Sequence, residues 1–236
     1  MDSQEPKTLD EKIKFVDEIN NLIWGQRGMA DFDREGLIKK ASQIAEEIDY
    51  KIGKAKCLLN AGMGIFIKKN DGRLSIEMMN EALDIFKKLD NKKWIANEHA
   101  TLGIIHSSLG NPEPALYNAL KGLDFYISNP EVDVDRIMIY YVIGTVYKDL
   151  GKFEEAEKNY LFGVNCIEIG NSNWGGRIYT GLAGVYIHQK KFNEALTVCF
   201  KALEILKKEN NNIGESRAYT DIGVIYKKLN NYDESL

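Results

Sequence analysis

The feature that most constrains this chain is an internal repeat of about forty residues. Its three clearest copies begin at Arg136, Arg177 and Arg217. One apolar place of the pattern is held by residues 143, 182 and 222, which lie 39 and 40 residues apart. A chain built from similar units, each touching its neighbours, forms an elongated array, and such arrays mainly bind other molecules.

The repeat continues more faintly toward the N-terminus. Gly62, Gly103 and Gly144 follow one another at intervals of 41 residues. Ala41 precedes Ala82 by the same interval, so residues 31–49 correspond to the second half of a still earlier unit. The sequence therefore predicts about six units, of which the last is incomplete.

Each unit has the pattern of a helix, a short turn and a second helix. Residues 177–189 and 192–206 carry apolar or small side chains at spacings of three and four, which line one face of a helix. Leu109-Gly110, Leu150-Gly151 and Leu229-Asn230 predict helix ends with a left-handed residue, which Gly and Asn tolerate. Sustained alternation with period two is absent, so the sequence predicts an all-α fold.

The pattern resembles the tetratricopeptide repeat. The fullest copy of the family motif consists of Gly144, Tyr147, Gly151, Phe153, Ala156, Tyr160 and Gly163. The resemblance covers residues 51–236 well and 9–50 weakly, and it implies a right-handed α-solenoid of antiparallel helix pairs. The period exceeds the family's usual ~34 residues, and about six extra residues add about 9 Å of helix per unit. Long repeats without the inter-repeat proline resemble the sensor and scaffold arms of bacterial signalling proteins.

This pattern also predicts the domain organisation. We expect residues 1–8 to form a disordered tail and residues 9–236 to form one repeat domain of about six helix pairs. The clearest break is the loop at 128–131, because Pro130 disfavours a continuous helix there. The last second helix would stop soon after Tyr232, whereas its counterpart spans 192–207. We therefore expect a fragment of a longer protein that continues into more repeats and an output domain.

Composition and charge indicate the cellular compartment of the protein and argue against some classes of partner. No apolar run approaches the ~18 residues of a membrane helix, and residues 1–12 lack the apolar core of a signal peptide. The three cysteines have no paired spacing, which favours reduced, buried thiols. A net charge of −4 argues against nucleic-acid or anionic-membrane partners. The sequence predicts a cytoplasmic protein.

No group of residues suggests catalysis. We expect His99, His106 and His188 to lie in different helices, and none has a partner at metal-ligand spacing. His106 stands at a core tyrosine position, which favours a packed side chain. Reactive cysteines need an exposed, electropositive site, and the cysteines here stand at helix positions expected to be buried. The sequence predicts no catalytic residue, no metal and no cofactor.

The resemblance places a binding site on the concave face, which the first helices of tetratricopeptide units line. By position, the side chains on this face are Asn60, Asn97, Arg136, Tyr141, Thr145, Arg177, Thr180, Arg217 and Thr220. Arginines one repeat apart could hold an acidic segment or a free carboxylate by paired hydrogen bonds. The threonines and asparagines could hold a peptide backbone. A second interpretation makes the arginines struts between repeats, paired with acidic residues such as Asp135, Glu215 or Asp221.

The function expected from this pattern is protein or peptide binding. The resemblance implies the N-terminal regulatory part of a signalling protein, with a histidine kinase or nucleotide cyclase as the output domain. The main alternative is a spacer that self-associates, with homo-oligomers formed through the truncated C-terminal end. An RNA-binding array would need a basic concave face, and an enzyme would need a clustered catalytic set.

Overall fold

The described part of the chain is a succession of helices joined by short turns. In the computed structural model, residues 6–25, 33–129, 136–167 and 174–233 are described, and among them there are eleven α-helices and no strand. The helices are α1 (Leu9–Gly25), α2 (Arg34–Glu47), α3 (Lys51–Lys69), α4 (Gly72–Lys88), α5 (Lys92–Ser108), α6 (Pro112–Ser128), α7 (Arg136–Asp149), α8 (Phe153–Ile167), α9 (Gly175–His188), α10 (Phe192–Lys208) and α11 (Asn212–Asp233). The predicted all-α fold is confirmed.

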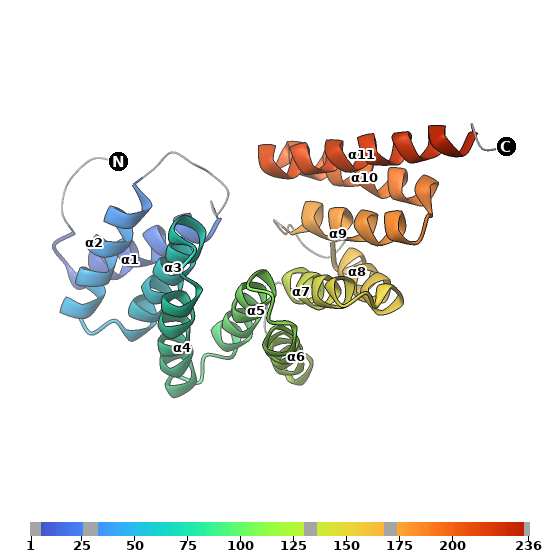
Figure 1. Ribbon diagram of the computed structural model, residues 1–236. Coiled ribbons are helices and arrows are strands. Elements are labelled where there is room, and N and C mark those ends of the chain that lie inside the picture. The colour runs from blue at the N-terminus through green and yellow to red at the C-terminus, as the bar shows by residue number, and fades with distance from the viewer. Residues whose placement is uncertain (1–5, 26–32, 130–135, 168–173, 234–236) are drawn as a thin grey trace.

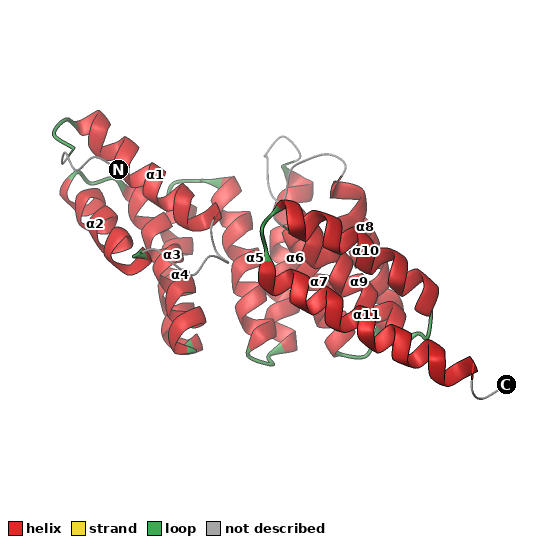
Figure 2. Ribbon diagram, turned by 90° about the horizontal axis from the view of Figure 1, so that it is seen from above, coloured by secondary structure: helices red, strands yellow, loops and turns green. Residues whose placement is uncertain are grey.

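The helices form antiparallel pairs that stack into an arc. Each helix packs against the next one along the chain, and α7 packs against both α5 and α9 as a first helix among first helices. The arc runs from α1–α2 through α5–α6 to α10–α11, so that the first and last helices lie at its two ends (Figure 1). From above, the helices lie side by side with the loops at their ends (Figure 2). This arrangement is an α-solenoid, as predicted.

Local sequence fixes where the helices begin. The side chains of Asp33, Asp71 and Asn91 accept hydrogen bonds from the backbone N–H three residues ahead, at 2.9, 3.0 and 3.2 Å. Such caps satisfy donors that the first helical turn leaves unpaired. Thr8 and Glu11 cap α1 reciprocally, through Thr8 Oγ1 and Glu11 Oε2. The tail expected at residues 1–8 lies largely outside the described residues.

The ends of the helices follow the predicted turns with one exception. Gly110 and Gly151 have φ of +72°, and Lys190 adopts the same left-handed region at the corresponding place. The turn predicted at Leu229-Asn230 is wrong, because α11 continues to Asp233. In the other units a second helix folds back and packs against the first. Asn tolerates a helix interior as well as a left-handed helix end, so the pair Leu229-Asn230 does not by itself end α11.

Small residues allow the paired helices to approach closely. Ala115, Ala156 and Ala195 are completely buried, as the repeat pattern predicts. The Tyr160 side chain is also completely buried, and a Cβ atom added to Gly144 or Gly181 would come within 2.8 or 2.6 Å of its ring. The absence of two Cβ atoms therefore makes the space that this ring fills.

Tryptophans lie at the junctions between units. Trp94 stacks on Phe86 of the preceding unit, with ring centroids 5.5 Å apart, and meets Trp24 edge-on at 5.4 Å. Trp174 lies 5.4 Å from Tyr141 of the preceding unit. Both tryptophans therefore pack between repeats. Among the described residues, α3 and α5 lack the extensive packing that other consecutive first helices show, so the aromatic group of Trp24, Phe86 and Trp94 lies at an irregular junction.

Candidate functional site on the concave face

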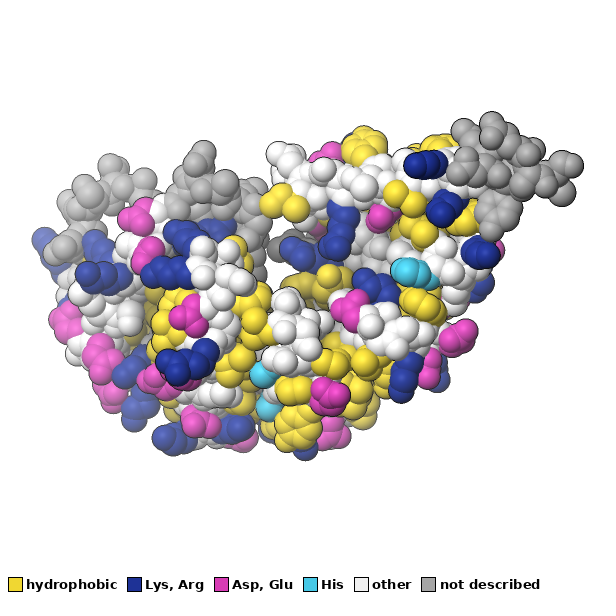
Figure 3. Space-filling view, viewed as in Figure 1, with side chains coloured by type: hydrophobic (Ala, Val, Ile, Leu, Met, Phe, Trp, Pro, Cys, Tyr) yellow, Lys and Arg dark blue, Asp and Glu magenta, His cyan; other side chains and the backbone are white. Residues whose placement is uncertain are grey.

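The nine predicted site residues all lie on first helices, but they do not form one cluster. Seven lie on α7, α9 and α11, near the C-terminal end of the arc. Asn60 on α3 and Asn97 on α5 lie apart from them. A space-filling view shows the hollow between the two ends of the arc, with Lys and Arg side chains near α9 and α11 (Figure 3).

Arg177 and Arg217 are exposed on neighbouring helices. The Arg177 guanidinium lies 5.0 Å from the ring centroid of Trp174, and Thr180 Oγ1 donates to the Arg177 carbonyl at 2.9 Å. Thr220, also exposed, donates to the Ser216 carbonyl in the same way. Both threonine hydroxyls thus bond to their own helix, which leaves the oxygen able to accept another hydrogen bond.

Within the described residues, no short ion pair supports the interpretation of the arginines as struts between repeats. Every salt bridge described there within 4.0 Å joins other side chains. Burial raises the pKa of Asp221, and the positive charges of Arg217 and Lys148 partly oppose that rise. Arg177 acts in the same way on Glu209, whose pKa burial also raises. Asp135 lies outside the described residues. The arginines therefore influence nearby carboxyl groups without a close ion pair.

The α7 residues serve partly as packing. Tyr141 lies between the rings of Tyr160 and Trp174, at 6.4 and 5.4 Å. Thr145 Oγ1 lies 3.0 Å from the Tyr160 hydroxyl, and this hydrogen bond satisfies the polar group of a completely buried side chain. The Arg136 guanidinium lies 4.0 Å from the ring centroid of Tyr126. Of these side chains, Tyr141 supports the Arg177 surface, because it packs against Trp174, over whose ring the Arg177 guanidinium lies.

The two asparagines are buried, which the sequence pattern did not indicate. Asn60 Nδ2 donates to the Asn20 carbonyl and to Asn20 Oδ1, at 3.2 and 2.9 Å. Asn20 in turn donates to the Val16 carbonyl at 2.9 Å. Asn20 precedes Asn60 by one repeat, so the period itself is the signal that could have identified this pair. Asn97 Oδ1 is buried, and no described residue donates a hydrogen bond to it.

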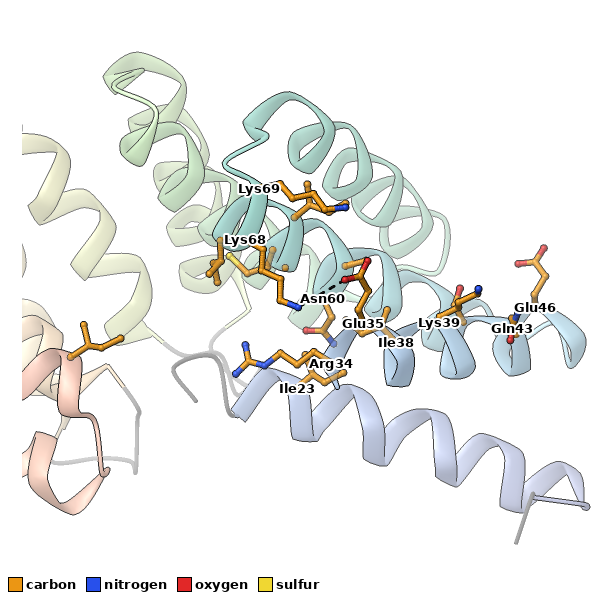
Figure 4. A pocket seen from close by; sticks show the side chains of 17 residues that line it. Ile23, Arg34, Glu35, Ile38, Lys39, Gln43, Glu46, Asn60, Lys68 and Lys69 are labelled. Carbon is orange, nitrogen blue, oxygen red and sulfur yellow. Dashed lines mark ion pairs between the residues drawn. The ribbon is translucent and has the colours of Figure 1, made fainter. Parts of the chain in front are cut away.

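A groove at the N-terminal end was not predicted. It has a volume of about 810 Å³ and is formed chiefly by α2 and α3, with Ile23 of α1 and Ile213 of α11 also on its lining. The close view shows Asn60 between α1 and α3, and Lys68 directed toward Glu35 (Figure 4). Of the predicted site residues, this groove includes Asn60 alone. Its walls come from segments far apart in the sequence, which explains why periodicity did not reveal it.

The titratable side chains do not assemble a reactive centre in the described residues. His99 and His106 both lie in α5, so the expectation that they occupy different helices was wrong. Burial lowers the pKa of each, and His99 Nδ1 lies 3.0 Å from Asn118 Oδ1. Burial raises the pKa of the Cys199 thiol to about 12. Within the described ranges, no three His, Cys, Asp or Glu side chains are grouped closely enough to hold a metal ion.

The length and the apolarity of a helix determine whether it can cross a membrane. None of the helices in the described residues combines the length and the apolarity that crossing a bilayer requires.

Comparisons with known proteins agree with the repeat architecture. A sequence model of the tetratricopeptide repeat matches residues 176–236, and a second one matches residues 139–161. A comparison with curated proteins finds no significant match.

Solved structures resemble the arc more broadly. A Rap protein complexed with Competence and Sporulation Factor superimposes with a TM-score of 0.71 at 16% identity, over 98% of this chain and 64% of that chain. NprR in complex with its cognate peptide NprX gives 0.70 at 20% identity, over 96% of this chain and 64% of that one. A signal-transduction ATPase with a tetratricopeptide repeat sensor from Pyrococcus horikoshii gives 0.63 at 15% identity, over 92% and 32%. The chain thus spans less than two thirds of the length of each of these proteins.

Proposed function

We propose that the concave face of this chain, which matches tetratricopeptide-repeat models at residues 139–161 and 176–236, binds an extended peptide or protein segment. On this proposal the chain has no chemistry of its own, and its partner contacts the first helices. Rap and NprR, which share the fold, were solved with Competence and Sporulation Factor and with the peptide NprX respectively. These neighbours support a peptide as the ligand.

The observation that carries the proposal is the pair of exposed arginines on adjacent first helices. Arg177 and Arg217 lie one repeat apart, and neither takes part in a described short salt bridge. Arg presents several donors in a planar arrangement that fits a carboxylate. The ligand is therefore an acidic segment or one with a free C-terminal carboxylate. Thr180 and Thr220 each lie three residues beyond an arginine, where their oxygens could accept backbone N–H groups.

We further propose that ligand binding regulates an attached output domain. The resemblance of the long repeats to bacterial signalling arms suggests a histidine kinase or a nucleotide cyclase, in the cytoplasm. The solenoid neighbours include a signal-transduction ATPase with a repeat sensor, which supports the sensor part of this proposal. The full gene provides the test: an open reading frame that ends at Leu236 would contradict it.

The proposal is tested with a peptide selected by the protein from a random heptapeptide library. In the double variant Arg177→Ala/Arg217→Ala, we expect the affinity for that peptide to fall by about 1.5–3 kcal/mol for each charge-assisted hydrogen bond that is removed. The melting temperature should change little, because both side chains are exposed. Fluorescence anisotropy measures the first quantity and calorimetry the second.

Arg73→Ala is the matched control, because Arg73 is an exposed arginine on a second helix, with 90% of its side chain accessible. It should bind the peptide as the wild type does. If the double variant unfolds appreciably earlier and still binds normally, the arginines are struts between repeats and the proposal loses its main residues.

A self-associating spacer is the second candidate, because α11 exposes apolar side chains. Ile213, Tyr219 and Tyr226 are 76%, 52% and 49% exposed. Light scattering over a hundredfold range of concentration separates the candidates. A constant monomeric mass favours the peptide receptor, whereas a mass that rises with concentration and is restored to that of the monomer by Tyr219→Ser/Tyr226→Ser favours the spacer.

A further inference from the structure

The groove at the N-terminal end of the arc has a charge opposite to that of the whole molecule. Its lining includes four basic side chains, Arg34, Lys39, Lys68 and Lys69, and two acidic ones, Glu35 and Glu46. The chain as a whole carries a net charge of −4. Both acidic side chains also form ion pairs with lysines. Glu35 Oε2 lies 3.9 Å from Lys68 Nζ, and Glu46 Oε2 lies 2.8 Å from Lys54 Nζ. The groove is therefore a basic site on an acidic protein.

Apolar side chains form the walls of this groove. Met63 and Ile23 are nearly buried beneath it, whereas Ile67 is 56% exposed. Ile213, 76% exposed, lines it from α11 at the other end of the chain. Exposed aliphatic side chains that converge on one concave surface are characteristic of a binding site, because water leaves them when a ligand enters.

The floor of the groove also contains a fixed polar group. Asn60 lines it, is 4% exposed, and has its amide nitrogen held by two hydrogen bonds to Asn20. Asn20 is itself held by the Val16 carbonyl. A side chain fixed in this way loses little conformational freedom when a ligand binds beside it.

We infer that this groove binds an extended peptide segment that carries aliphatic side chains and at least one carboxylate. The aliphatic side chains contact Ile38, Met63 and Ile67, and the carboxylate lies between Lys39 and Lys69. The volume of about 810 Å³ suits a few residues of peptide. A fatty acid has the same two elements, but it offers nothing to the amide of Asn60, so the polar floor favours a peptide backbone.

This inference rests on the proposed function and deepens it, because it assigns a second part of the concave surface and the side chains that it recognises. A peptide seated here would also contact Ile213 of α11. It would therefore bridge the first and last units of the arc, and Ile213→Ser should weaken its binding. That consequence distinguishes the groove from a site confined to α2 and α3.

The test uses the methyl resonance of Met63 in protein labelled with ¹³C-methyl methionine. Met63 lines the groove, whereas Met138 is completely buried in α7 and serves as the internal control. The substitution Met63→Leu assigns the resonance with little change of volume. The probes are three acetylated pentapeptides at millimolar concentration: Leu-Glu-Ile-Leu-Glu, Leu-Lys-Ile-Leu-Lys and Ser-Glu-Ser-Ser-Glu.

We expect the first peptide to shift the Met63 resonance and to leave that of Met138 unchanged. The basic and the apolar-deficient peptides should produce no saturable shift. No shift at Met63 with the first peptide, or an equal shift with the basic one, overturns the inference. Decanoate is tested in the same way. If it shifts the Met63 resonance and none of the peptides does, the inference is also overturned, because the groove would then bind a fatty carboxylate.

Variants separate this site from the arginine face. The double variant Lys39→Glu/Lys69→Glu should bind the first peptide with an affinity at least tenfold lower. The matched control Lys87→Glu/Lys88→Glu, on the exposed end of α4, should keep the affinity of the wild type. An equal loss in both pairs would reduce the effect to overall charge and contradict the inference. If Met63 does not respond while the library-selected peptide still requires Arg177 and Arg217, the groove assignment fails and the proposed function stands. If Met63 responds but the arginine variant binds normally, the groove stands and the arginines do not.

Discussion

The Tyr160 side chain packs between two neighbouring repeats. It extends from α8, is completely buried, and lies against the glycines Gly144 of its own unit and Gly181 of the next. Burial raises the pKa of its hydroxyl far above the ordinary range, and the hydrogen bond with Thr145 partly opposes that rise. A single aromatic ring thus fixes the distance between two first helices.

Two glycines at the same place of the repeat should respond in opposite ways. Gly144→Ala would place a Cβ atom 2.8 Å from the Tyr160 ring, so we expect a loss of about 1–3 kcal/mol in the free energy of unfolding. Gly223, the equivalent residue in α11, has no neighbour within 4 Å of the added atom. There alanine favours the helix, and Gly223→Ala should gain about 0.5–1 kcal/mol. Urea denaturation measures both, and losses of equal size would contradict the packing described.

Among the elements, α5 carries two histidines that are at least partly buried, so we expect its stability to depend on pH. It carries His99 and His106, and burial lowers the pKa of both from 6.5. A lowered folded-state pKa means that the neutral imidazole is favoured in the folded protein. The associated stability is present above the unfolded-state pKa and is lost as the pH falls through the folded-state value.

We therefore expect the melting temperature to fall as the pH is lowered from about 7 to about 5. His106→Tyr introduces the residue found at the corresponding place in three later units, and it removes one of the two protonation sites. Its melting temperature should depend less on pH over this range. His188→Tyr, at an exposed position on α9, is the control, and identical pH profiles for the two variants would exclude His106 as a cause.

At the scale of the whole molecule, stability is distributed along the arc. In the described part of the chain the buried residues form four successive clusters, from the one around Val16 and Ala41 to the one around Tyr160 and Leu206. Each cluster draws on neighbouring helices, so the effect of a local change should decay over a unit or two.

Ala195→Leu tests this distribution. Ala195 is completely buried between paired helices, and the larger side chain should cost about 1–3 kcal/mol through overpacking. Hydrogen exchange should accelerate in α9, α10 and α11 and remain unchanged in α1–α4. A uniform acceleration along the chain would indicate one cooperative globule instead of an array.

How much the sequence could predict depends on how far apart along the chain the interacting residues lie. The period predicted the helix pairs and the turns at Gly110 and Gly151, because each depends on spacing within a unit or between adjacent units. The pairing of Asn60 with Asn20 also lay within reach of the period, since the two residues are one repeat apart, whereas the groove depends on Ile213 at the far end of the chain. The turn predicted at Leu229-Asn230 was wrong because Asn tolerates a helix interior as well as a left-handed helix end. Features that join distant segments were therefore beyond the reach of periodicity.

The tryptophans at the junction of α3 and α5 have a spectroscopic consequence. The chain contains three tryptophans, and two of them, Trp24 and Trp94, meet edge-on with centroids 5.4 Å apart. Indoles held this close and at a fixed angle couple their ultraviolet transitions, which gives a paired positive and negative band in circular dichroism. A change of curvature at this irregular junction would alter the angle between the rings and hence the amplitude of those bands. Bending of the arc can therefore be followed optically, in the unlabelled protein, by the signal of its own indoles.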